Sequence, residues 1–257
     1  MLFDIRGRRK HVVRVVYAIL ALLMGASLFL VVGPFNIGTL GGGGSGAEAS
    51  EVLDEQAEQA EARLSRDEDN PNLQLAVVRA RVAAGNAEAE ANPQTGAPVL
   101  NAEARQDFEQ ATQIWNVYLE ETDEVNPSGA LLMANTFFTL AEAGASVEEI
   151  VVNVKGAAAA QRLVAEARPS AGFLTTLASY EYLAGNFEAG DAASEKAKGK
   201  ATAQEKKQVE EQVTEARKRG KQWQTEKKRF AKTEKEQGKE ALQNPFGGLA
   251  GSSGLGE

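Results

Sequence analysis

Residues 171–188 read AGFLTTLASYEYLAGNFE, and this stretch decides the fold class. Its apolar side chains recur every three or four residues as far as Leu183, which is typical of an amphipathic helix. Gly185 and Asn186 form a pair that ends helices, because both residues tolerate the left-handed backbone of a helix terminus. A second helical segment begins at Phe187. Two helices joined by so short a break lie antiparallel, so the sequence predicts a helical hairpin here.

The same alternation of helix and break extends toward the N-terminus. Helical periodicity fills five further segments, which are residues 48–66, 72–84, 101–122, 129–143 and 146–168. Breaks such as Gly85-Asn86 and Asn126-Pro127 separate them, and residues 87–100 predict a long loop. We therefore expect an all-α fold, in which residues 48–200 form an α-solenoid of about three degenerate helical hairpins. A helical bundle without repeats is the alternative, because it uses the same apolar spacings.

The segment Leu177–Glu188 resembles the tetratricopeptide-repeat (TPR) family, whose unit has about 34 residues in two antiparallel helices. The match lies in the small residues of the first helix and in the Gly185-Asn186-Phe187 turn. Two positions depart from the family: the first-helix aromatic is displaced by one position to Tyr182, and Gly190 replaces the usual alanine. The resemblance covers roughly residues 50–200 and implies stacked, TPR-like hairpins.

In the TPR family the first helix of each pair lines a concave groove that holds a polypeptide partner. By that resemblance, the partner groove of this chain comprises Arg79, Asn135, Thr175, Ser179 and Tyr182. The family's basic carboxylate clamp is not reproduced, so we do not expect the groove to capture a partner's free C-terminus.

The N-terminal region predicts a membrane anchor. The uncharged run Val15–Val32 follows five basic residues and would span roughly 27 Å as a helix, close to a bilayer core of about 30 Å. We expect a basic cytoplasmic tail at residues 1–14, a transmembrane helix at 15–37 and a Gly-rich linker at 38–47. This layout predicts a single-pass plasma-membrane protein whose C-terminal domain is extracytoplasmic. A secretory signal cleaved near Ala47–Ala49, or a buried helix of a soluble protein, is the alternative.

Residues 201–243 contain no proline and predict one long basic helix. Its heptad-like stripe, which includes Val209, Val213 and Trp223, predicts that the helix caps the last hairpin. Docking onto a second copy or onto a partner helix is the alternative. Four basic residues of this helix are candidates for partner contacts: Lys227, Lys228, Arg229 and Lys232. The Gly-rich residues 244–257 predict a disordered tail.

Charge is distributed unevenly along the chain, whose 36 acidic and 28 basic side chains give a net charge of −8. Residues 41–168 carry a net charge of −14, whereas residues 196–240 carry +7. The basic segment suits anionic lipid headgroups, a cell-wall polymer or an acidic protein. We expect no nucleic acid partner, because the lysines are spread around the helix with few aromatic residues between them.

The residue types argue against catalysis. The chain has no cysteine and a single histidine, His11, which excludes a thiolate site and a multi-histidine zinc site. Adjacent acids such as Glu120 and Glu121 point about 100° apart on a helix, so they do not converge on one bond. We expect no catalytic residue, metal or cofactor, and therefore no enzyme.

Anchor and repeats together predict a membrane-anchored protein-interaction scaffold of the cell envelope. It would be chaperone-like or ancillary to a membrane protein complex such as the secretion translocon, since bacterial ancillary proteins of the translocon have a similar layout. The alternative is a structural subunit or assembly factor of a cell-envelope complex that docks through the basic helix. The sequence indicates neither the partner nor the oligomeric state.

Overall fold

The computed structural model describes residues 46–92 and 98–237 of the 257-residue chain. Its elements are α2 (Gly46–Leu64), α3 (Pro71–Glu88), β1 (Glu90–Ala91), β2 (Pro98–Val99), α4 (Ala102–Glu121), α5 (Pro127–Glu142), α6 (Val147–Ala167), α7 (Ala171–Ala184), α8 (Phe187–Lys200) and α9 (Lys206–Gln237). The predicted all-α architecture is confirmed for these residues. The predicted cytoplasmic tail (1–14), transmembrane helix (15–37) and C-terminal tail (244–257) lie outside them, as does most of the linker (38–47).

Polar caps start the helices at the predicted breaks. The side-chain oxygen of Asn70 accepts hydrogen bonds from the first backbone N–H groups of α3, and Pro71 is the first helical residue. Asn126 and Pro127 start α5 in the same way, with N–H to oxygen distances of 3.0 Å. The side chains of Asn101, Ser146 and Ser170 cap α4, α6 and α7. These caps satisfy N–H groups that have no partner within the helix, so these breaks fix where α3, α4, α5, α6 and α7 begin.

The predicted helix end at Gly85-Asn86 is wrong. Helix α3 continues through Gly85 to Glu88, and the predicted loop 87–100 contains the antiparallel β1–β2 ladder. A Cβ atom at Gly85 would lie 2.8 Å from the ring of Phe108 on α4. The glycine therefore allows close packing of two helices and does not terminate one.

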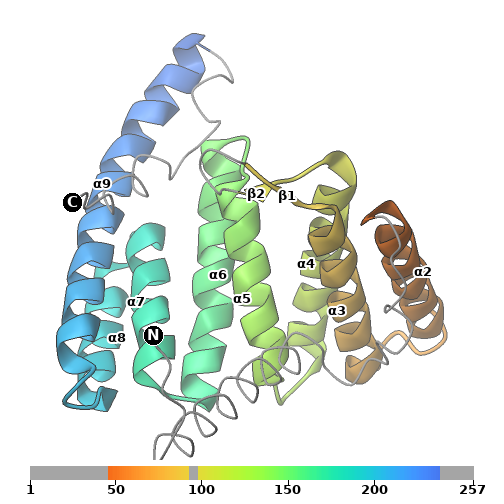
Figure 1. Ribbon diagram of the computed structural model, residues 1–257, viewed down its shortest axis with the longest axis horizontal. Coiled ribbons are helices and arrows are strands. Elements are labelled where there is room, and N and C mark those ends of the chain that lie inside the picture. The colour runs from red at the N-terminus through yellow and green to blue at the C-terminus, as the bar shows by residue number, and fades with distance from the viewer. Residues whose placement is uncertain (1–45, 93–97, 238–257) are drawn as a thin grey trace, which may run out of the picture. The chain divides into compact units, whose positions relative to one another are not determined.

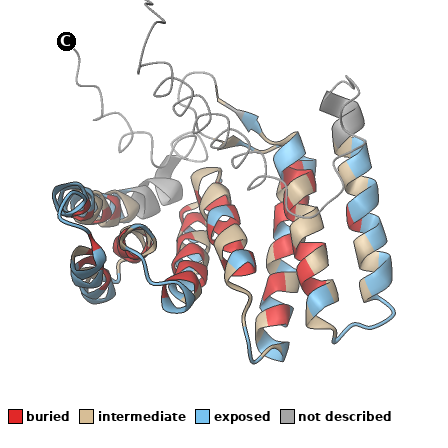
Figure 2. Ribbon diagram, turned by 60° about the horizontal axis from the view of Figure 1, so that its bottom comes forward, coloured by how far each residue is buried: buried red, intermediate tan, exposed pale blue. Residues whose placement is uncertain are grey.

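The helices form stacked hairpins. Helix α3 packs on α4, α5 on α6 and α7 on α8, and each hairpin packs on the next (Figure 1). The buried residues lie on the sides where helices face one another (Figure 2). The largest cluster extends from α3 to α7 and includes Phe108, Trp115 and Met133. This arrangement is a helical solenoid, as the recurrence of helix and break predicts.

Tyr182 explains both departures from the expected repeat pattern. Its side chain is 1% exposed between α7, α8 and α9. A Cβ atom at Gly190 of α8 would lie 2.5 Å from Cδ1 of the ring, and one at Gly220 of α9 would lie 2.6 Å from the Tyr182 Cβ. The displaced aromatic ring therefore occupies the space that an alanine side chain at residue 190 would need.

Helix α9 covers the end of the solenoid. Val209 and Val213 are buried against the last hairpin, and the Gln224 side chain donates to the Leu183 carbonyl oxygen at 2.7 Å. Trp223 is fully buried and reaches past that hairpin to Ile150 and Val154 of α6. The predicted packing of this stripe within the chain is thus confirmed, and it extends farther than the last hairpin.

Candidate partner-binding surface

The first helices of the three hairpins, α3, α5 and α7, each keep a stripe of exposed or half-buried residues. On α5 this stripe has the spacing of successive turns, from exposed Asn135 through half-buried Phe138 to half-buried Glu142. We name the stripes together the first-helix face, and it consists of Arg79, Asn135, Phe138, Glu142, Thr176 and Ser179. Three of the five predicted groove residues belong to it: Arg79, Asn135 and Ser179.

The other two predicted groove residues, Thr175 and Tyr182, are buried. Thr175 is 8% exposed, and its hydroxyl donates to the Ala171 carbonyl oxygen at 2.8 Å. The Tyr182 hydroxyl lies 2.8 Å from both the Asp191 carboxylate and the Ser194 hydroxyl. The prediction that these two side chains face a partner is therefore wrong. Helical spacing puts them on one stripe with Ser179, but the sequence alone does not show that α8 and α9 cover Tyr182.

An acidic niche joins α5 and α7 on this face. The rings of Phe138 and Tyr180 stack with centroids 5.0 Å apart and an angle of 26° between their planes. Glu142 follows Phe138 by one helical turn, and its negative charge acts on the Tyr180 hydroxyl. The Tyr180 ring itself is buried, with 8% of its surface exposed. We name Phe138, Glu142 and Tyr180 the acidic niche.

The surroundings of Glu142 disfavour the charged form of its carboxyl. Burial raises the pKa of the Glu142 carboxyl. Burial, and secondarily the Glu142 charge, raises the pKa of Tyr180 to about 12. Within the described residues no hydrogen bond or ion pair reaches the Glu142 carboxylate. Glu142 is also the last residue of α5, where the helix dipole disfavours negative charge.

Several other charged side chains between the helices form ion pairs, whereas the buried Oε2 of Glu88 on α3 has no hydrogen-bond partner among the described residues. Arg81 of α3 bonds to Glu61 of α2 at 2.7 Å and to Asp107 of α4 at 2.9 Å. Arg105 and Glu149 join α4 to α6, Arg162 and Glu181 join α6 to α7, and Arg217 and Asp191 join α9 to α8. Sequence reasoning did not identify these pairs, because nothing in the spacing of the residues shows which helices meet. These ion pairs hold helices together, and none of them involves the Glu142 carboxylate.

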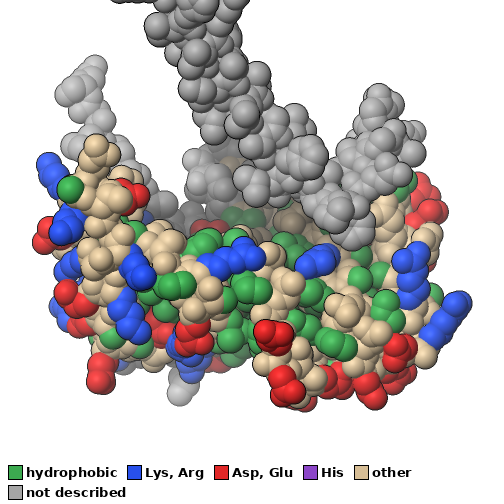
Figure 3. All heavy atoms as spheres, turned by 90° about the horizontal axis from the view of Figure 1, so that it is seen from below, with side chains coloured by type: hydrophobic (Ala, Val, Ile, Leu, Met, Phe, Trp, Pro, Cys, Tyr) green, Lys and Arg blue, Asp and Glu red, His purple; other side chains and the backbone are tan. Residues whose placement is uncertain are grey.

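A basic surface lies where α9 crosses α6. Lys227 is half-buried, and burial lowers its pKa, as do the neighbouring charges of Lys155 on α6 and of Lys228. Lys228 and Arg229 are exposed, while the side chain of Lys232 lies outside the described residues. In the view from below, Lys and Arg gather on the left, where α8 and α9 lie in Figure 1, and Asp and Glu along the lower right edge (Figure 3). The charge asymmetry of the sequence is therefore present on the surface.

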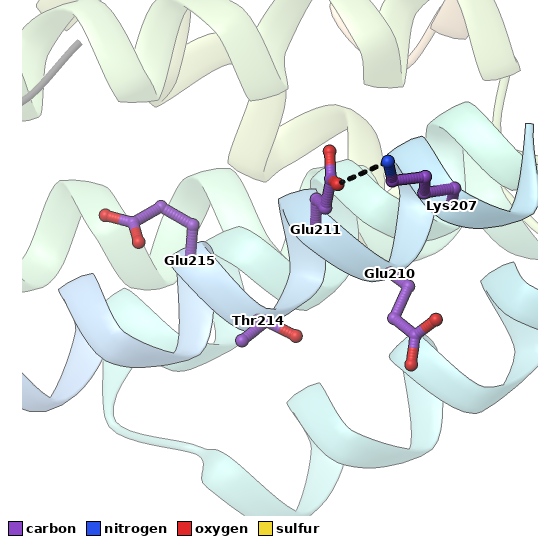
Figure 4. Close-up of a pocket in the computed structure, with 5 residues that line it drawn as sticks. All are labelled: Lys207, Glu210, Glu211, Thr214 and Glu215. Atoms are coloured by element: carbon purple, nitrogen blue, oxygen red, sulfur yellow. Dashed lines mark ion pairs between the residues drawn. The ribbon is translucent and has the colours of Figure 1, made fainter. Parts of the chain in front are cut away.

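A shallow hollow runs along the first turns of α9. It is lined by Lys207, Glu210, Glu211, Thr214 and Glu215. Figure 4 shows Glu211 and Glu215 on one side of the helix and Glu210 on the other. Lys207 and Glu211 form a 3.8 Å ion pair and are 88% and 69% exposed. Because these carboxylates do not converge and face water, the hollow lacks the geometry of an acid–base pair.

Across residues 46–92 and 98–237, no three potential ligand side chains are placed to hold a metal ion. No helix in that part of the chain is both long and apolar enough to span a bilayer. The predicted span at residues 15–37 is outside it.

No family model, curated protein or solved structure matches this chain. The TPR resemblance therefore stays a prediction.

Proposed function

We propose that this protein is a membrane-anchored scaffold of TPR-like helical hairpins whose first-helix face holds a polypeptide partner. One observation carries the proposal. The first-helix face carries an exposed amide, Asn135, and a half-buried carboxylate, Glu142, and among the described residues neither has a hydrogen bond or an ion pair to another helix, whereas the ion pairs described above join helices to one another. Polar groups that the fold itself does not use are available to contact a partner.

The proposed membrane anchor is the apolar run within residues 15–37. A helix there would hold the helical domain outside the cytoplasm, since basic residues precede it. Protease added to intact cells or spheroplasts should digest the chain beyond the linker and spare residues 1–14. Recovery of a soluble chain that starts near Ser50 would instead establish a cleaved signal.

Site-specific crosslinking tests the partner face. The chain lacks cysteine, so the substitution Asn135→Cys provides a unique attachment point for a photo-crosslinker on α5. The matched control is Ala159→Cys, which is exposed on α6, the second helix of the same hairpin. We expect the Asn135 position to capture polypeptides that the Ala159 position does not. Many different clients would indicate a chaperone-like role and one stoichiometric partner an assembly role, while equal capture at both positions would contradict the proposal.

The basic surface supports a second candidate, docking of an anionic partner in an envelope complex. Lys155 adds a cation from α6 to the predicted set on α9. Neutralising Lys227, Lys228, Arg229 and Lys232 together should then weaken partner recovery, and added salt should weaken it in the unaltered chain. If partner recovery responds neither to the neutralisation nor to added salt, the first-helix face remains the proposed partner site.

A further inference from the structure

The two terminal helices of the solenoid carry opposite charge. Residues 50–70, which comprise most of α2 and the turn after it, contain eight acids and two bases, a net charge of −6. Residues 217–232 of α9 contain eight bases and one acid, a net charge of +7. Helix α2 lies at one end of the stack and α9 at the other (Figure 1). A second copy of the chain therefore offers each end a surface of complementary charge.

Helix α2 carries a row of acids that the fold itself does not use. Glu51, Glu55 and Glu58 are spaced by four and three residues, so they lie on one side of the helix, and all three are exposed. Glu61, the acid of α2 that pairs with α3, is not among them. Within the described residues no hydrogen bond or ion pair involves the three exposed carboxylates. We name Glu51, Glu55 and Glu58 the acidic row.

Two lysines on α9 form a matching basic row. Lys221 and Lys228 are exposed and lie two helical turns apart on one side of the helix. Their separation along the helix axis is roughly 10 Å, the same as that between the first and last acids of the acidic row. In the described part of the chain neither ammonium group forms a hydrogen bond or an ion pair. The charge of Lys221 acts on Asp191, which pairs with Arg217.

We propose that the chain associates head to tail with a second copy, with the acidic row of one copy against the basic row of the next. Such a contact joins two different surfaces and leaves one free end of each kind, so it repeats into an open row of domains. The polar outer face of a terminal helix normally keeps a solenoid from stacking on another, but faces of opposite charge attract. This association goes beyond the proposed function, because it involves α2 and α9 and not the first-helix face.

Sedimentation velocity of the purified full-length chain in dodecyl maltoside tests the association. At about 0.1 M salt the screening length is about 10 Å, so the distant like charges of two copies are screened while paired rows still attract. There we expect a mean protein mass of at least about twice that of one chain. The mass should fall to that of one chain at about 1 M salt, where the screening length is about 3 Å. The mass of one chain at the lower salt concentration, up to the highest soluble protein concentration, overturns the proposal.

Two charge-reversed variants identify the surfaces. One variant combines Glu51→Lys, Glu55→Lys and Glu58→Lys, and the other combines Lys221→Glu and Lys228→Glu. Each reverses the sign of one row, so the two rows repel when copies of the same variant meet. Each variant alone should therefore sediment as a single chain. An equimolar mixture should assemble again, because each row of one variant is complementary to a row of the other, and this recovery also shows that both variants are folded.

The control reverses two exposed acids away from the ends of the solenoid, by Glu109→Lys on α4 and Glu166→Lys on α6. It should assemble like the unaltered chain. Assembly that survives the reversal of either row, or a mixture of the two variants that stays dissociated, overturns head-to-tail association. Loss of assembly in the control as well would assign the effect to net charge and would also overturn it.

Discussion

Tyr182 and Gly190 act as one packing unit between α7 and α8. The Tyr182 ring cannot move aside freely, because its hydroxyl bonds to Asp191 and Ser194. We predict that Gly190→Ala lowers the unfolding free energy by about 1–3 kcal/mol, the usual cost of overpacking. Gly199→Ala on the same helix is the control: its Cβ meets nothing within 4 Å, and it should stabilise by up to about 1 kcal/mol. Urea unfolding of both variants measures this, and similar effects at the two positions would contradict it.

We predict that replacing Glu142 with a neutral residue stabilises the folded protein. Because the folded protein raises the pKa of Glu142 above its ordinary value of 4.5, folding favours the protonated carboxyl. The penalty for the charged form therefore grows as pH rises through 4.5 and above. We expect Glu142→Gln to stabilise the protein at pH 7 by about 0.5–1 kcal/mol, a helix-terminus effect. The gain should vanish below the ordinary Glu pKa, and a variant no more stable at neutral pH would contradict the electrostatics of the niche.

Some of the predicted groove residues lie at the surface and others lie in the interior, for a physical reason. Asn135 and Ser179 were predicted from the TPR resemblance and are exposed and half-buried, whereas the burial of Tyr182 depends on where α9 packs, which the sequence pattern does not encode. Glu142 gave a usable signal, since an acid at the predicted end of a helix opposes the dipole. Recognising the niche also required Tyr180 to be placed beside it, and only the fold does that.

Helix boundaries also differ in how well the sequence predicts them, because some depend on local bonds and others on contacts with distant residues. Starts were predictable because Asn-Pro and Ser caps act locally, through bonds to N–H groups two or three residues away. The end of α3 was not, because Gly85 serves a contact with Phe108, a residue far along the chain. Gly185, which does adopt the left-handed conformation at φ 89°, ends α7 as predicted.

Trp223 is the residue through which α9 reaches α6. We predict that Trp223→Ala costs about 3–5 kcal/mol of unfolding free energy, as expected for a buried tryptophan. Hydrogen exchange should accelerate in α9 and in the N-terminal half of α6, while α3 and α4 stay protected. The exposed neighbour Gln222, changed to alanine, is the control. A loss below about 1 kcal/mol would mean that α9 does not depend on this contact.

Contacts between the hairpins are mostly those between neighbours, so the solenoid is nearly one-dimensional in its energetics. The exception is α9, which touches α6, α7 and α8. The two ends also differ in charge, with the acids concentrated in residues 41–168 and the bases in residues 196–240. Partners of opposite charge would therefore meet different ends of the same domain.

The asymmetry of the ends has a mechanical consequence. Helix α2 is joined to its neighbours by little beyond buried Ala57 and the Glu61–Arg81 pair, whereas α9 is fastened across three helices. Tension applied through the two ends of the chain would therefore peel the domain from α2 inward, one hairpin after another. The α7–α9 end would unfold last. A force applied through the N-terminal side would therefore extend the domain in steps while the basic surface stays folded.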